Sequence, residues 1–144
     1  RRAICIPPSF LLEPQSQQDV PVLLSAVIIF NLALLHQLSA QQDGEKRRTQ
    51  LTQAAQLYTL LHELQRSDPF ENNVLFVMAT MNNLGLVHAQ LQDATNANRC
   101  FQGLLAVILM FSTGCDKQRR DFDGFLGNVL SFMSVSLFIC APAA

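Results

Sequence analysis

The sequence predicts an all-α protein built from paired helices. Apolar residues recur every three or four positions through most of the 144-residue chain, which is the spacing of one helix face. The alternation of apolar and polar residues that marks strands is absent, and polar breaks containing Pro, Gly or Asp separate the apolar runs. At this length the chain suits one domain with a core of its own.

The first helix is preceded by a stretch that does not favour helix. Residues 1–19 contain three prolines and a Gln/Ser run, which predict an extended lead. Asp19 can cap a helix that has Pro21 in its first turn, a position where proline is tolerated. The uncharged apolar run that follows predicts a helix over residues 20–40.

The polar stretch QQDGEKRRT ends this helix, and apolar residues at helical spacing predict a second helix from about Thr49 to Arg66. The segment SDPFE then gives the clearest helix start in the chain. Asp68 stands at an N-cap, Pro69 at the first helical position, and Glu71 where it can complete a capping box. We therefore expect a third helix to begin near Pro69.

The remaining helices follow from the same signals. The third helix is expected to end near Leu91, and Asp93 is placed to cap a fourth helix that continues to Met110. The segment STGCDKQRRD predicts a loop. A last helix covers about residues 122–138, before the Ala/Pro tail of residues 141–144.

Two pairs of helices match each other at particular positions. NLALLH (31–36) aligns with NLGLVH (83–88), and AAQLYTLL (54–61) aligns with ANRCFQGL (97–104). A small residue lets two helices approach closely, and an aromatic residue fills the gap that this leaves. The predicted repeat-packing residues are Leu32, Ala33, His36, Ala54, Tyr58, Leu84, Gly85, His88, Ala97 and Phe101.

This pattern resembles the tetratricopeptide repeat family, whose unit pairs two helices with small and aromatic residues at such positions. From Leu84 to Ala97 is 13 residues, the spacing of the family, whereas from Leu32 to Ala54 is 22, so we expect a nine-residue insertion in the first turn. The implied fold is a TPR-like solenoid of antiparallel helix hairpins within residues 20–140, with repeat one at about 26–66, repeat two at about 72–110 and a closing helix at about 122–138.

The resemblance implies a non-enzymatic module that binds a protein or peptide partner in the concave groove of the repeats. In this family the first helix of each repeat lines the groove, where an amide can both donate to and accept from a peptide backbone. The candidate partner-binding residues are Asn31, Asn83, Asn128, Asn82, Gln37 and Gln90. The alternative, that these amides bond neighbouring groups of the same chain or solvent, is equally open.

The sequence gives little support to other chemistry. His36, His62 and His88 are evenly spaced, but two of them share a repeat position and the third lies on the other helix type, so they are not expected to converge on a metal. No nucleophile elbow or Gly-rich phosphate loop occurs, and a net charge of −1 gives no reason to expect nucleic acid. We therefore expect no enzyme activity, metal or cofactor, and the four scattered cysteines favour reduced thiols in the cytoplasm or nucleus.

Two alternatives stay open beside the interaction module. Uncharged runs near residues 20–42 and 124–144 are long enough to cross a bilayer, as in a membrane-associated helical protein. The polar side chains within both runs, and the repeat pattern, favour a protein partner over a membrane. The chain is 49% hydrophobic and only 15% charged, which also fits a structural fragment of a longer helical solenoid. The partner, the pathway and the oligomeric state are not specified by the sequence.

Overall fold

The computed structural model describes residues 20–42, 44–67, 74–111 and 116–139. These residues form five helices and no strand: α1 (Val20–Ser39), α2 (Arg47–Ser67), α3 (Val74–Gln90), α4 (Ala94–Phe111) and α5 (Asp116–Ile139). The all-α prediction is therefore confirmed. The expected lead of residues 1–19, the capping segment 68–71 and the tail of residues 141–144 lie outside the described residues.

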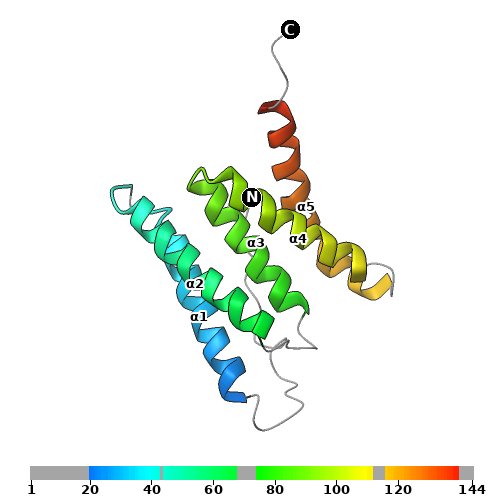
Figure 1. Cartoon of the computed structure of the whole chain (residues 1–144), viewed down its shortest axis with the longest axis horizontal. Helices are drawn as coiled ribbons and strands as arrows, with labels where there is room; N and C mark the ends of the chain where they lie inside the picture. Colours follow the sequence, from blue (N-terminus) through cyan, green and yellow to red (C-terminus); the bar gives the residue numbers. More distant parts are fainter. Residues whose placement is uncertain (1–19, 43, 68–73, 112–115, 140–144) are drawn as a thin grey trace.

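The helices follow one another in space in the order of the sequence (Figure 1). The helix α1 packs along α2, α2 packs against α3, and α3 packs along α4. The last helix, α5, lies against α4 and the adjoining side of α3. Two helical hairpins therefore stand side by side, with α5 on the far side of the second, and α3 is surrounded by other helices while α1 is at the edge.

Aromatic side chains join neighbouring helices in the core. The Phe30 ring of α1 lies 5.6 Å from the Tyr58 ring of α2 and 5.4 Å from the Phe76 ring of α3, measured between ring centroids. At the other side, the rings of Phe101 in α4 and Phe132 in α5 are 4.7 Å apart. All five side chains are buried, and offset or edge contacts of this kind stabilise beyond the area they bury.

Two glycines allow the close approach of α3 and α4. A Cβ atom placed on Gly85 would lie only 3.0 Å from Cζ of Phe101, so a larger side chain would displace the aromatic ring. Gly103 on α4 lies against the terminal methyl group of Met81 on α3. A helical glycine costs about 1 kcal/mol relative to alanine, and contact with the Phe101 ring offsets that loss. Ala33, at the position in α1 that corresponds to Gly85, is fully buried.

The sequence predicted that all the extra residues of the first hairpin lie in its turn. In the structure only some of them do. The connection between α1 and α2 has seven residues, 40–46, against three residues, 91–93, between α3 and α4. In addition, α2 begins seven residues before Ala54, whereas α4 begins three residues before Ala97. Part of the insertion is therefore an added turn of helix at the start of α2, where Arg and Gln residues favour helix.

One helix start differs from expectation, and another cannot be compared because it lies outside the described residues. The helix α5 begins at Asp116, so residues 116–121, which we expected in a loop, are helical. Their Lys, Gln and Arg residues are good helix formers that extend the apolar helix that follows them. The helix α3 is described from Val74, and the expected start near Pro69 falls outside the described residues.

The short connection between α3 and α4 is fixed by two capping motifs. Gln92 has a left-handed φ of 64°, its N–H donates to the Ala89 carbonyl, and the Asp93 N–H donates to the His88 carbonyl at 2.9 Å. This pair of bonds is a Schellman motif. Asp93 then caps α4, because its Oδ1 accepts a hydrogen bond of 3.1 Å from the Asn96 N–H. Together these bonds turn the chain so that α4 packs back along α3.

Candidate interaction surface

Most of the amides predicted to bind a partner lie inside the protein. Among the six, the four buried residues are Gln37, Asn82, Asn83 and Asn128. Asn31 and Gln90 are exposed. The expectation of an open groove lined by these amides is therefore not met for the buried four, because neighbouring helices cover them.

The four buried amides and Tyr58 form one chain of hydrogen bonds from α5 to α1. Asn128 Nδ2 donates to Asn82 Oδ1 at 2.9 Å, and Asn82 Nδ2 donates to Asn83 Oδ1 at 3.0 Å. Asn83 Nδ2 donates to the Tyr58 hydroxyl at 3.2 Å, and this hydroxyl donates to Gln37 Oε1 at 3.1 Å. Because every bond runs in the same direction, each polarises the next. These asparagines thus bond groups of their own chain.

The helix α3 has one face that α2 covers. Equivalent positions of the two hairpins are 52 residues apart in the sequence, as in Asn31 and Asn83. On this side of α3 the side chains are at most 1% exposed: Phe76, which also contacts Phe30 of α1, Thr80, Asn83 and Val87. Tyr58 of α2 accepts the hydrogen bond from Asn83, and Gln65 Nε2 of α2 donates to Thr80 Oγ1 at 3.3 Å.

The same face of α1 is open to solvent. The side chains of Leu24, Ile28 and Leu35 are 58–59% exposed, Leu38 is 43% exposed, and Asn31 is exposed between them. We call these five residues the outer α1 stripe. They alternate in steps of four and three along the sequence, so they lie on one side of the helix.

Leu32 shows the same contrast at a predicted packing position. It flanks the outer α1 stripe and is 43% exposed, whereas the equivalent Leu84 is 6% exposed. The prediction that Leu32 packs within the repeat is therefore wrong. The physical reason is that no described helix covers this side of α1, while α3 has neighbours on several sides.

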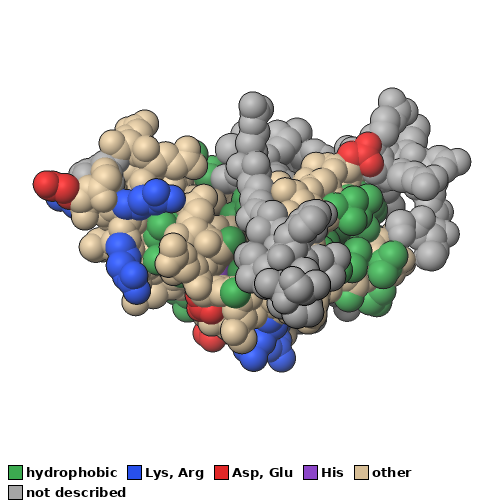
Figure 2. Space-filling view, turned by 90° about the horizontal axis from the view of Figure 1, so that it is seen from above, with side chains coloured by type: hydrophobic (Ala, Val, Ile, Leu, Met, Phe, Trp, Pro, Cys, Tyr) green, Lys and Arg blue, Asp and Glu red, His purple; other side chains and the backbone are tan. Residues whose placement is uncertain are grey.

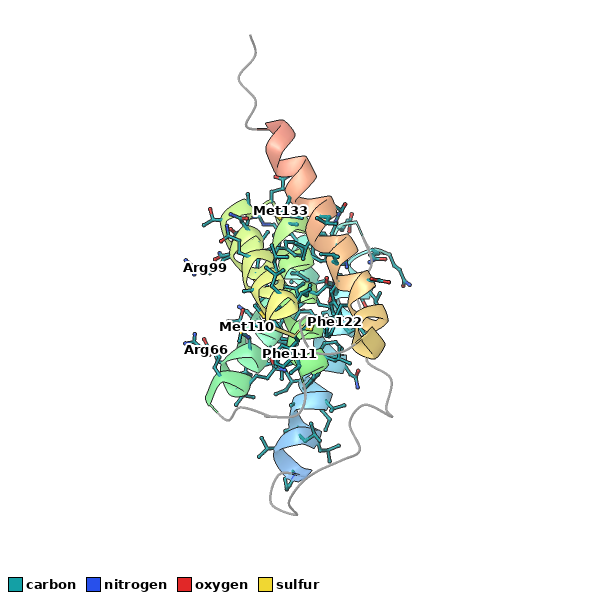
Figure 3. The ribbon with its side chains drawn as sticks, turned by 90° about the vertical axis from the view of Figure 1, so that its right-hand side faces the viewer. Arg66, Arg99, Met110, Phe111, Phe122 and Met133 are labelled. Carbon is teal, nitrogen blue, oxygen red and sulfur yellow. The ribbon has the colours of Figure 1, made fainter. Side chains whose placement is uncertain are left out.

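A second apolar area lies where α4 ends. Leu109, Met110 and Phe111 are exposed there, and Figure 3 shows Met110 and Phe111 near Phe122, at the beginning of α5. Hydrophobic side chains gather at this end of the molecule in Figure 2, whereas Lys and Arg side chains lie mainly toward the other end. This area borders residues 112–115, which are outside the described residues, and it is shorter than the outer α1 stripe.

An open cleft of about 530 Å³ lies between α2 and the connection from α3 to α4. Its charged and titratable lining residues are Arg48, Glu63, His88 and Asp93. Hydrogen bonds from Asn96 lower the pKa of the Asp93 carboxyl, and His88, whose Nδ1 lies 3.2 Å from Asp93 Oδ2, lowers it further. The carboxylate thus serves to cap α4. Within the described part of the chain, no three His, Cys, Asp or Glu side chains could hold a metal ion together.

His36, His62 and the thiol of Cys100 are each partly buried. His36 Nδ1 lies 2.6 Å from Gln50 Oε1 and so joins α1 to the added turn of α2. His62 Nδ1 is buried without a hydrogen-bond partner, and burial, together with the nearby Arg66, lowers the pKa of this ring. Burial raises the pKa of the Cys100 thiol to about 11, so the thiol is protonated and weakly nucleophilic at neutral pH.

Comparison with known proteins gives no match: no family model, curated protein or solved structure matches this chain. The resemblance to tetratricopeptide repeats therefore depends on the sequence positions described above, and it stays a prediction.

Proposed function

We propose that this chain is a TPR-like interaction module that binds an α-helix of a protein partner on the outer α1 stripe. The observation that supports this most is the contrast between α1 and α3: the face that α2 covers on α3 is open on α1. From Leu24 to Leu38 the helix carries no Asp, Glu, Lys or Arg. An apolar surface of this length and regularity is typical of a binding site.

The proposed binding mode is one helix packed along another. Exposed Leu and Ile side chains spaced by three and four residues form a ridge, between whose members the side chains of a partner helix can pack. Removal of this apolar area from water supplies the affinity, at about 25 cal/mol per Å² before the losses of association. Asn31 adds a polar contact, as its counterpart Asn83 does with the Tyr58 hydroxyl.

The helix α2 is itself a guide to a suitable partner, because it covers the equivalent face of α3. A fluorescent peptide of residues 47–67 should bind the chain, and its anisotropy should rise with chain concentration in the micromolar range. The double variant Ile28→Lys/Leu35→Lys should bind at least about tenfold more weakly, because two ammonium groups would be buried.

The matched control is Leu60→Lys/Leu64→Lys, which adds the same charges at exposed apolar positions of α2, outside the outer α1 stripe. This variant should bind the peptide like the unaltered chain. If the anisotropy stays constant up to about 100 µM of a chain that remains monomeric, affinity is too weak for a specific helix site and the proposal fails.

A lipid surface is the second candidate occupant. Within the described residues, α1 from Pro21 to Ser39 is the one helix that is long and apolar enough to cross a membrane, by length and composition. Of this segment 28% is buried, and Gln37 is bonded to Tyr58, so the exposed side of α1, with the outer α1 stripe and the neighbouring Leu32, would touch lipid in the folded chain. Flotation of the chain with phosphatidylcholine vesicles would favour this candidate, and a chain left unbound would exclude it. The predicted second run, 124–144, extends beyond the described residues.

The third candidate occupant is another helix of the same polypeptide, in a longer helical solenoid. In such an array, a preceding helix of the same polypeptide would cover the outer α1 stripe, as α2 covers α3. A polypeptide extended toward the N-terminus would then protect Leu35 from solvent and would no longer bind the peptide of residues 47–67.

A further inference from the structure

The outer α1 stripe is arranged almost symmetrically about its central residue. Leu24 stands seven positions before Asn31, and Leu38 stands seven positions after it. Ile28 stands three positions before it and Leu35 four positions after. All five side chains are exposed, so a helix running in the opposite direction would meet nearly the same series of side chains from either end.

We propose that the occupant of the outer α1 stripe is a second copy of this chain, paired antiparallel about a two-fold axis through Asn31. Leu24 of one copy faces Leu38 of the other, Ile28 faces Leu35, and the two Asn31 residues meet at the axis. This inference rests on the proposed function, because it names the partner helix for the same surface.

The chemistry of Asn31 suits a two-fold axis. An amide carries both donors and an acceptor, so two Asn31 side chains can exchange hydrogen bonds reciprocally. In any shifted register each amide would lie against leucine and lose its bonds to water, which is unfavourable for a polar group. A single polar residue within an apolar seam fixes register in this way in paired helices.

Charge and size are also compatible with self-association. An isologous interface must be complementary to itself, and an uncharged stripe meets its own copy without repulsion. The outer α1 stripe, Leu24 to Leu38, covers about 22 Å of helix, and two such strips bury on the order of 1,000 Å² in total. This is near the lower limit for a specific interface, so the dimer should dissociate in the micromolar range.

Sedimentation equilibrium of the full chain tests the association. The unaltered chain should show a monomer–dimer equilibrium, and Ile28→Lys/Leu35→Lys should raise the dissociation constant at least 100-fold. The control Leu60→Lys/Leu64→Lys should leave it within about threefold, since both changes lie outside the interface. Circular dichroism shows whether each variant retains its helices.

Cysteine crosslinking tests the geometry separately. Under mild oxidation Asn31→Cys should form a disulfide between two copies at position 31. Leu24→Cys and Leu38→Cys should each fail to crosslink alone but should crosslink to each other when mixed. The unaltered chain, treated in parallel, identifies products of the native cysteines, and peptide mapping assigns each bond.

The outcomes separate this inference from the function on which it rests. A chain that stays monomeric at about 200 µM, or that crosslinks position 24 to position 24, overturns the antiparallel dimer. If such a chain still binds the peptide of residues 47–67 through the outer α1 stripe, the proposed function stands and the partner is another protein. If both dimerisation and peptide binding are lacking, both proposals fail.

Discussion

The helices α1 and α3 occupy equivalent places in two hairpins, yet their corresponding faces have opposite surroundings. Asn83 on α3 is buried and bonded to Tyr58, whereas Asn31 on α1 is exposed. Val87 is fully buried, whereas its counterpart Leu35 is 59% exposed. The two helices carry similar residues at these aligned positions, while burial follows the number of neighbouring helices. An edge helix therefore carries the surface that an inner helix uses for packing.

The largest expected effect comes from placing a charge on each of these two faces. Val87→Lys should prevent stable folding, because an unpaired ammonium group would be buried within the helical core. Leu35→Lys should change the free energy of unfolding by less than about 0.5 kcal/mol, since the side chain is in water. Urea unfolding followed by circular dichroism at low chain concentration measures both. Equal losses of stability would break the comparison between α1 and α3.

Replacing Asn83 should lower the free energy of unfolding more than replacing Asn31. This difference should be smaller than that between the two lysine variants. Asn83→Ala removes the middle of the buried chain and leaves groups of Asn82 and Tyr58 without this partner. We expect a loss of about 2–6 kcal/mol, from about 1–3 kcal/mol for each of the two groups affected. Asn31→Ala should change stability by less than about 0.5 kcal/mol. The same urea titrations apply, and a stable Asn83→Ala variant would show that the hydrogen-bond chain contributes little.

The glycine at the contact between α3 and α4 can be compared with one in open space. Gly85→Ala should destabilise by about 1–2 kcal/mol, because its Cβ would press on the Phe101 ring. A Cβ atom added at Gly127 on α5 would meet no atom within 4 Å. Gly127→Ala should therefore stabilise the folded chain by up to about 1 kcal/mol through helix propensity. Melting temperatures would move in opposite directions. A melting temperature raised by both changes would contradict the close packing at Gly85.

The connection between α3 and α4 offers a smaller test. Gln92 ends α3 in a left-handed conformation that favours glycine, so Gln92→Gly should stabilise by about 0.5–1 kcal/mol. The control Gln102→Gly, at an exposed position within α4, should destabilise by about 1 kcal/mol. Differential scanning calorimetry measures the stability of both variants. A destabilised Gln92→Gly variant would mean that the Gln92 side chain contributes to the turn.

The smallest expected effect is a pH dependence carried by α2, the helix that covers α3. The pKa of His62 is lowered in the folded chain from 6.5, mainly by burial. The unfolded chain therefore binds a proton more readily, so this contribution to stability is present above pH 6.5 and is lost as the pH falls through the folded pKa. His62→Gln should show a smaller fall in melting temperature between pH 7 and pH 5. An identical fall in both proteins would assign it to other groups.

The sequence was sufficient to predict the helices and the small and aromatic residues that face one another. Periodicity and capping residues mark helices locally, and Gly85 stands out because glycine is otherwise unfavourable in a helix. The sequence could not show that Asn83 is buried and Asn31 exposed, because both stand in the same local pattern. It also did not separate loop from helix in residues 116–121, where polar helix formers suit either state. Burial depends on tertiary neighbours, which repeat spacing does not specify.

The most direct measurement of the central claim is the reactivity of a thiol placed on each face. Leu35→Cys and Val87→Cys would be labelled with a maleimide at chain concentrations from nanomolar to about 100 µM, with peptide mapping at each position. The account predicts that position 35 reacts rapidly in dilute solution and slowly at high concentration, while position 87 is protected throughout. Protection of position 35 at every concentration would show that its own chain already covers this face, and rapid reaction at every concentration would show that no second copy docks there.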